Sequence, residues 1–168
     1  LAHLADRSPL QFRAQSPATG PLADALSEFR IPVQDFQLRY TDGRRRSTAA
    51  LAEQLTEICH RNAISLLHAN SLAMSRLIGG LPADQLPAGI RRTGHLRDII
   101  RLSNKAIADL NNNDALVAVS DATSAFHADQ GIRNCRVIHN GVDTGRFQPR
   151  ERAAARGELL PNIPPDAF

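Results

Sequence analysis

Short runs of β-branched and aliphatic residues alternate along this chain with longer stretches in which apolar residues recur every three or four positions. Strands are predicted at the short runs, which are residues 10–15, 33–38, 64–68, 90–95, 115–120 and 137–139. Helices are predicted between them, at residues 21–29, 47–58, 71–78, 99–110 and 121–130. Strand–helix alternation at this spacing predicts an α/β fold, with an open parallel sheet covered by helices on both faces.

Several helix ends carry residues suited to them. Pro21 opens one helix, where the amide hydrogen that it lacks would have no helical partner in any case. Leu22, Leu26 and Phe29 follow at i, i+4 and i+7 and are expected to form one apolar stripe against the core. Ser120 follows a strand and is expected to cap the next helix.

Polar side chains follow the predicted strands where each strand ends. They occur at four strand ends, in His68-Ala69-Asn70, His95-Leu96-Arg97-Asp98, Ser120-Asp121 and His139-Asn140-Gly141. Ligands of open parallel sheets bind beyond the carboxyl ends of the strands, so these residues are expected to line one edge and to suit a hydroxyl-rich or phosphorylated ligand. We interpret His68 and His139 as hydrogen-bonded structural residues, and His95 as the stronger candidate because Arg97 and Asp98 follow it.

Composition narrows the class of protein. A chain of 168 residues suits one domain and can bury a core without disulfides. A net charge of +3, no Trp and one Tyr argue against a dedicated nucleic-acid binder. The two cysteines have no metal-ligand spacing and are interpreted as reduced thiols of a cytosolic protein. No apolar run is long enough to span a bilayer, and both ends look cut, so a fragment of a longer protein is expected.

Residues 136–149, RVIHNGVDTGRFQP, hold the most informative pattern: a strand, an Asn140-Gly141 turn in which positive φ is easily adopted, and an irregular exit. With HAN, HLRD and LVAVS before it, this segment resembles the first domain of family 4 glycosyltransferases. The resemblance implies the N-terminal half of a GT-B fold, Rossmann-like and without its first strand. Residues 1–149 would be the acceptor-side domain, and residues 150–168 the linker and the start of a donor-binding domain.

The resemblance also implies roles for individual residues. His95 would be the catalytic residue that borders the donor sugar and orients it, and Asn70 would lie where relatives contact the acceptor. The substrate-binding residues would be Asn70, Arg97, Asp98, Asn140 and Gly141. No metal and no cofactor are implied, because the nucleotide sugar is a substrate and the leaving diphosphate is stabilised by basic groups and helix N-termini.

The activity implied is the retaining transfer of a sugar from a nucleotide-sugar donor to a glycan or lipid-linked acceptor, as in polysaccharide biosynthesis. The fragment alone is expected to be inactive. A cytoplasmic location is expected, with a peripheral contact to the inner face of the membrane through Arg44, Arg45 and Arg46 as the sharper alternative to a solvated loop.

Two other readings of the sequence stay open. One is a flavodoxin-like small-molecule-binding module, which would leave the Asn-Gly-Val-Asp segment unexplained. The other is a sugar-nucleotide epimerase of GT-B architecture, which would share the fold and differ in chemistry. A dinucleotide oxidoreductase is disfavoured, because the sequence contains no Gly-x-Gly-x-x-Gly.

Overall fold

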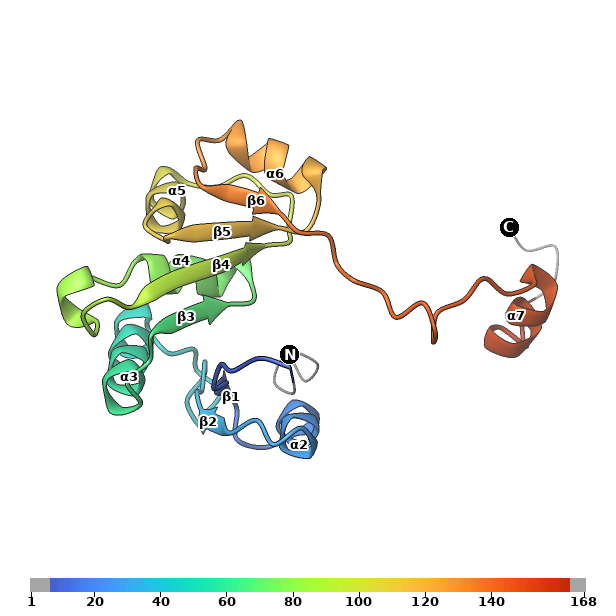
Figure 1. The fold of residues 1–168 in the computed structure, drawn as a ribbon, viewed down its shortest axis with the longest axis horizontal. Coiled ribbons are helices and arrows are strands. Elements are labelled where there is room, and N and C mark those ends of the chain that lie inside the picture. The colour runs from blue at the N-terminus through green and yellow to red at the C-terminus, as the bar shows by residue number, and fades with distance from the viewer. Residues whose placement is uncertain (1–6, 164–168) are drawn as a thin grey trace. The chain divides into compact units, whose positions relative to one another are not determined.

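The computed structural model describes residues 7–163 of the chain. It divides into two compact units, Leu1–Ile138 and His139–Phe168. The described strands all belong to the first unit, and the described part of the second contains one helix, α7 (Arg152–Leu159) (Figure 1). Residues 139–149, which were predicted to close the first domain, lie in the second unit, and the boundary between two domains at residue 149 stays a prediction.

The strands of the first unit form two sheets in which every pairing is parallel. They are β1 (Ala14–Ser16), β2 (Val33–Asp35), β3 (Leu66–Ala69), β4 (Arg91–Leu96), β5 (Ala115–Ala118) and β6 (Cys135–Val137). β1 pairs with β2, and the other sheet has the order β3-β4-β5-β6, with its arrows pointing the same way in Figure 1. The predicted α/β class, with Rossmann-like parallel sheets and helices on both faces, is confirmed.

The helices follow the strands in the expected alternation. They are α2 (Pro21–Glu28), α3 (Thr48–Arg61), α4 (Leu72–Gly79), α5 (Asn104–Asn111) and α6 (Asp121–Ala128), with a short 3₁₀ turn at Ala83–Gln85. α3 to α6 begin at serines whose hydroxyls accept the amide three residues on, and these serines are Ser47, Ser71, Ser103 and Ser120. The cap predicted at Ser120 is therefore confirmed.

Helices cover one face of the larger sheet more closely than the other. α4 contacts β3 and β4, α6 contacts β5 and β6, and α5 packs on α4. On that face, Leu96 and Leu116 pack with Leu72 of α4 and Leu110 of α5 in an apolar cluster. The opposite face is less covered and exposes 49% of Leu66. This second face carries His68 of β3 and Thr93 and His95 of β4, whereas Arg92 lies on the covered face.

β4 contains two arginines near its beginning, and both have partners in the fold. The Arg92 guanidinium donates to the carbonyls of Ile78 and Leu81, 3.4 and 3.0 Å away, at the C-terminal end of α4, where the helix dipole favours a cation. Arg91 forms an ion pair with Asp114, and its Nη1 lies 2.9 Å from Oδ1. The backbone amide of Arg92 also donates to Asp114, which is the main cause of that carboxyl's lowered pKa. The two arginines thereby fasten the beginning of β4.

The helix predicted at residues 99–110 begins later, so that part of the prediction is wrong. α5 starts at Asn104, after the Ser103 cap, and residues 97–103 form an irregular segment. Its backbone groups form hydrogen bonds with side chains from another part of the chain instead of with one another. The carbonyl of Asp98 accepts a hydrogen bond from His127, and the amide of Leu102 donates one to Gln130. These bonds remove the groups that the first helical turn would have used.

The apolar stripe predicted for the first helix is also wrong in part. α2 buries Ala23 and Leu26, whereas Leu22 and Phe29 are 60% and 51% exposed. α2 is only eight residues long and Phe29 lies at its C-cap, outside the regular turns. The buried pair at i and i+3 therefore replaces the longer stripe.

Candidate functional site

Three of the side chains predicted from the strand ends meet beyond β3 and β4. Asn70 directly follows β3, His95 is the penultimate residue of β4, and Arg97 comes just after β4. The Asn70 Oδ1 atom lies 3.0 Å from His95 Nδ1 and accepts a hydrogen bond of 2.6 Å from Arg97 Nη2. Parallel pairing of β3 with β4 brings these residues together, because it places the carboxyl ends of neighbouring strands side by side.

The same contacts define the protonation of the His95 ring. A guanidinium can only donate, so the Asn70 atom that Arg97 contacts is assigned as the amide oxygen. That oxygen can only accept, and Nδ1 of His95 must therefore carry the hydrogen. In the neutral ring, this leaves the lone pair of Nε2 able to accept a hydrogen bond or a proton from a ligand hydroxyl.

His68 lies beside these three residues, although the sequence led us to interpret it as structural. We call the four residues Asn70, His95, Arg97 and His68 the His95 cluster. Its ring lies edge-on to that of His95, with centroids 5.1 Å apart, and its Nδ1 lies 2.8 Å from the Thr93 hydroxyl. The strand period of two places His68 on the same face as Thr93, its register partner, and this pairing was the available signal. The histidine is both a structural residue and a neighbour of the candidate catalytic ring.

Both imidazoles are held towards the neutral form. Partial burial is the main cause of the lowered pKa of His95, and the nearby His68 and Arg97 add to it. Partial burial also lowers the pKa of His68, with a further contribution from Arg97. His68 remains exposed by surface area, so its desolvation is incomplete and its shift is expected to be modest. A neutral pair at pH 7 suits acceptance of hydrogen bonds from hydroxyls.

We expect NMR titration to place both ring pKa values below the ordinary 6.5. A lowered pKa means that the folded chain binds fewer protons than the unfolded chain, so stability from these groups is present above pH 6.5 and is lost as the pH falls below it. His68→Gln should raise the pKa of His95, because it removes a neighbouring positive charge at low pH. An unchanged His95 titration in this variant would show that the two rings do not interact.

Residues 16–146 match Glycosyltransferase Family 4. The chain belongs to this family. The structure is also similar to that of HepE from Anabaena, determined in complex with UDP and glucose, with a TM-score of 0.66 and 19% sequence identity. The similarity covers 95% of this chain and 45% of HepE, so the chain spans less than half of that protein. No curated protein matches the chain.

Asp98 of this family 4 chain is placed differently from its neighbours in the cluster. Its side chain is exposed, and its backbone carbonyl accepts a 2.7 Å hydrogen bond from Nε2 of His127 in α6. The structure therefore fixes the backbone of Asp98 directly beside the cluster. A role for its carboxylate in substrate binding stays a prediction.

Asn140 and Gly141 lie in the second unit and are exposed there. The positive-φ turn predicted for them is wrong: among the described residues, the glycines with positive φ are Gly20, Gly43, Gly89 and Gly131. The chain turns a few residues later, where the Asp143 carboxylate accepts the amides of Gly145 and Arg146, 2.9 and 3.1 Å away. An aspartate that bonds the amide two residues on supplies this turn without positive φ at the glycine.

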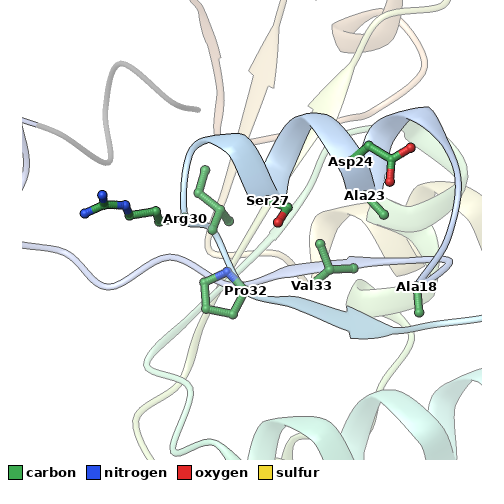
Figure 2. Close-up of a pocket in the computed structure, with 8 residues that line it drawn as sticks. Ala18, Ala23, Asp24, Ser27, Arg30, Pro32 and Val33 are labelled. Atoms are coloured by element: carbon green, nitrogen blue, oxygen red, sulfur yellow. The ribbon is translucent and has the colours of Figure 1, made fainter.

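A wide-open hollow of about 480 Å³ lies apart from the cluster, between α2 and β2. Figure 2 shows Ala23 and Ser27 projecting from α2 towards Val33, while Arg30 extends away from the hollow. None of the side chains of the His95 cluster lines it. The hollow therefore adds no residue to the candidate site.

The described part of the chain shows neither a metal-binding cluster nor a helix suited to a bilayer. Over residues 7–163, no group of three or more His, Cys, Asp or Glu side chains is arranged to hold a metal ion. Over the same residues, none of the helices has the length and apolar character required to cross a bilayer.

Proposed function

We propose that this chain forms the acceptor-side half of a glycosyltransferase that moves a sugar from a nucleotide-sugar donor to a glycan or lipid-linked acceptor, with retention of configuration. The observation that carries the proposal is the contact of His95, Asn70 and Arg97 beyond β3 and β4. Membership of Glycosyltransferase Family 4 supports the reaction class. The HepE complex with UDP and glucose supports a nucleotide sugar as the donor.

In this proposal, the cluster orients the donor and stabilises charge. Nε2 of a neutral His95 accepts a hydrogen bond from a sugar hydroxyl, while Asn70 fixes the ring through Nδ1. The Arg97 guanidinium supplies positive charge beside the leaving diphosphate and keeps Asn70 in place. Fixed donors and charges of this kind lower a barrier by being arranged before the reaction, with no reorganisation during it. Neither a metal nor a redox cofactor enters the proposal.

A donor screen tests the proposed function. The protein would be incubated with UDP-glucose and with other nucleotide sugars, and release of the nucleoside diphosphate would be measured with and without a glycan or lipid-linked acceptor. Acceptor-dependent release from one donor class, with the product anomer identified by NMR, would support a retaining transferase. Interconversion of sugar epimers without transfer would support the epimerase alternative, and neither release nor interconversion with any of the donors would contradict both. Because the chain spans 45% of HepE, the screen should use the whole protein.

We further propose a cytoplasmic location against the inner face of the membrane, through the basic segment around Tyr40. An antiparallel bridge joins Arg39 to Arg45, and the guanidiniums of Arg44 and Arg46 lie 5.9 and 4.7 Å from the centroid of the Tyr40 ring. Tyr40 is 41% exposed. An exposed aromatic ring bordered by arginines is suited to the headgroup region of an anionic bilayer.

Charge reversal tests this membrane contact. Each arginine near an anionic surface contributes about 1 kcal/mol, so the double variant Arg44→Glu, Arg45→Glu should weaken sedimentation with phosphatidylserine vesicles by about thirtyfold or more. Arg46 is left intact because its guanidinium lies closer to the Tyr40 ring than that of Arg44. Arg133→Glu, an exposed site elsewhere in the fold, is the control and should leave vesicle binding nearly unchanged. Binding that is insensitive to anionic lipid would exclude the contact.

A further inference from the structure

The segment that follows β4 is held in place by two side chains from a distant part of the sequence. His127, in the last turn of α6, contacts the carbonyl of Asp98, and its Nε2 lies 2.7 Å from that oxygen. Gln130, in the turn after α6, accepts the amide of Leu102 at 2.7 Å and donates to the carbonyl of Ile100 at 3.2 Å. Backbone groups of alternate residues, 98, 100 and 102, are thus bound by α6 and its following turn.

The hydrogen bonds of His127 and Gln130 also fix the tautomer of the first side chain and the amide orientation of the second. A carbonyl only accepts, so Nε2 of His127 carries the hydrogen, and in the neutral ring Nδ1 is left as an acceptor. Nδ1 lies 3.4 Å from the Gln130 amide nitrogen, which also donates to the carbonyl of Phe126. His127 is fully buried, and each of its ring nitrogens has a hydrogen-bond partner within the protein. This arrangement leaves one orientation for the Gln130 amide, with its oxygen facing Leu102.

We propose that His127 and Gln130 are positioning residues: they hold residues 97–103 so that Arg97 stays on Asn70 beside His95. His127 and Gln130 together form a clamp on this segment. Arg97 lies directly beside the clamped residues, because β4 ends at Leu96 and Asp98 follows Arg97 in the chain. Ile99 and Ile100 cannot supply the same anchoring, since they are 54% and 48% exposed, and Leu102 at the far end of the segment packs half-buried against the apolar cluster. The part of this inference that concerns catalysis rests on the proposed function.

A purely structural role would have a different signature, and the fold offers a matched control. Asn111 also binds two backbone groups of a loop: it donates to the carbonyl of Gly131 and accepts the amide of Arg133, at 2.9 and 2.8 Å. That loop precedes β6, at the amino end of the sheet, whereas residues 97–103 follow β4 at the carboxyl end. Loss of the His127 and Gln130 bonds, or of the Asn111 bonds, should lower the free energy of unfolding by similar amounts. Only loss of the His127 and Gln130 bonds should alter the His95 cluster.

The first test measures order in the segment, independently of any activity. Gln130→Met removes the hydrogen bonds at a half-buried position and is expected to fold, and the amide of Leu102 should then exchange with deuterium about fivefold faster or more, by loss of one hydrogen bond. In the same variant, loosening of Arg97 should raise the pKa of His95 measured by NMR, because Arg97 contributes to its lowering. Asn111→Leu should change neither quantity.

The second test measures the reaction with UDP-glucose as the probe donor. Gln130→Met and His127→Leu should raise KM for UDP-glucose several-fold, with a smaller change in kcat, and His127→Gln should restore part of the loss because its amide can donate to Asp98. Faster exchange at Leu102 with an unchanged KM and an unchanged His95 pKa would overturn the proposal and leave a structural clamp only. If the wild-type protein turns over no nucleotide sugar, the proposed function fails, while exchange at Leu102 and the His95 titration still decide whether the clamp positions Arg97.

Discussion

Replacing Gly79 by alanine is expected to lower the melting temperature by about 10 °C, because a Cβ at this position has no space. It would lie well inside van der Waals contact with the backbone carbonyl oxygen of Asp109 in α5, and 2.6 Å from Nδ2 of Asn113. Overpacking of this kind costs about 3 kcal/mol, and in a chain of this size each kcal/mol corresponds to roughly 2–4 °C. The backbone of α5 cannot rotate aside as a side chain can, so α4 and α5 must separate.

The neighbouring glycine provides the control. A Cβ on Gly80 would lie 3.2 Å from the carbonyl oxygen of Arg76 and 3.4 Å from Oδ1 of Asp109, distances that small shifts accommodate. Gly80→Ala should therefore melt within a few degrees of the wild type in the same differential scanning experiment. A Gly79→Ala protein as stable as the Gly80→Ala protein would contradict the close packing of α4 on α5.

His95→Ala should reduce sugar transfer by about a hundredfold or more while the protein remains folded. The ring is half-buried at the edge of the sheet, so its removal leaves the apolar core intact, but it deletes the Nε2 acceptor and releases Asn70. Loss of one positioned acid–base or hydrogen-bonding group typically costs about 10² to 10⁴ in rate. The measurement is the initial rate of nucleoside diphosphate release with the donor identified in the screen.

Two conservative variants separate the roles of the ring nitrogens. His95→Asn keeps a donor near the Nδ1 position and should preserve the contact with Asn70, whereas His95→Gln places an amide near the Nε2 position. If Nε2 contacts the donor, His95→Asn should be nearly as inactive as His95→Ala. His60→Ala is the matched control, since His60 contacts the carbonyl of Gln85 at the other end of β3 from Asn70 and should retain full activity. Equal activity of all four proteins would remove His95 from the proposed site.

Periodicity and helix caps made most of the fold predictable from the sequence. Serines at the starts of α3, α4 and α6 cap these helices as local chemistry requires, and the apolar runs lie at or beside the observed strands. The beginning of α5 is predicted five residues too early, although Ser103 caps it locally, because hydrogen bonds from His127 and Gln130, about thirty residues away in the sequence, hold the residues before it outside the helix. Local propensity carries no information about partners at that separation.

Only those residues of the candidate site that lie at the carboxyl ends of strands could be predicted from the sequence. Asn70, His95 and Arg97 each follow or close a strand, so parallel pairing was sufficient to bring them together. His68 has the hydrogen bond expected of a structural residue, but its place beside His95 depends on the β3–β4 register, which the local sequence does not show. Asn140 and Gly141 were assigned a turn from their dipeptide alone, whereas the Asp143 side chain builds the turn further along the chain.

Binding of a nucleotide sugar at His95, Asn70 and Arg97 can be followed through the histidine ring nitrogens by NMR while UDP-glucose is added. We expect a saturable shift of Nε2 in His95, with a smaller shift in His68 and none in His60. The shift should disappear in Arg97→Met. Saturable binding of UDP-glucose that leaves the His95 ring unchanged would show that the sugar nucleotide binds elsewhere.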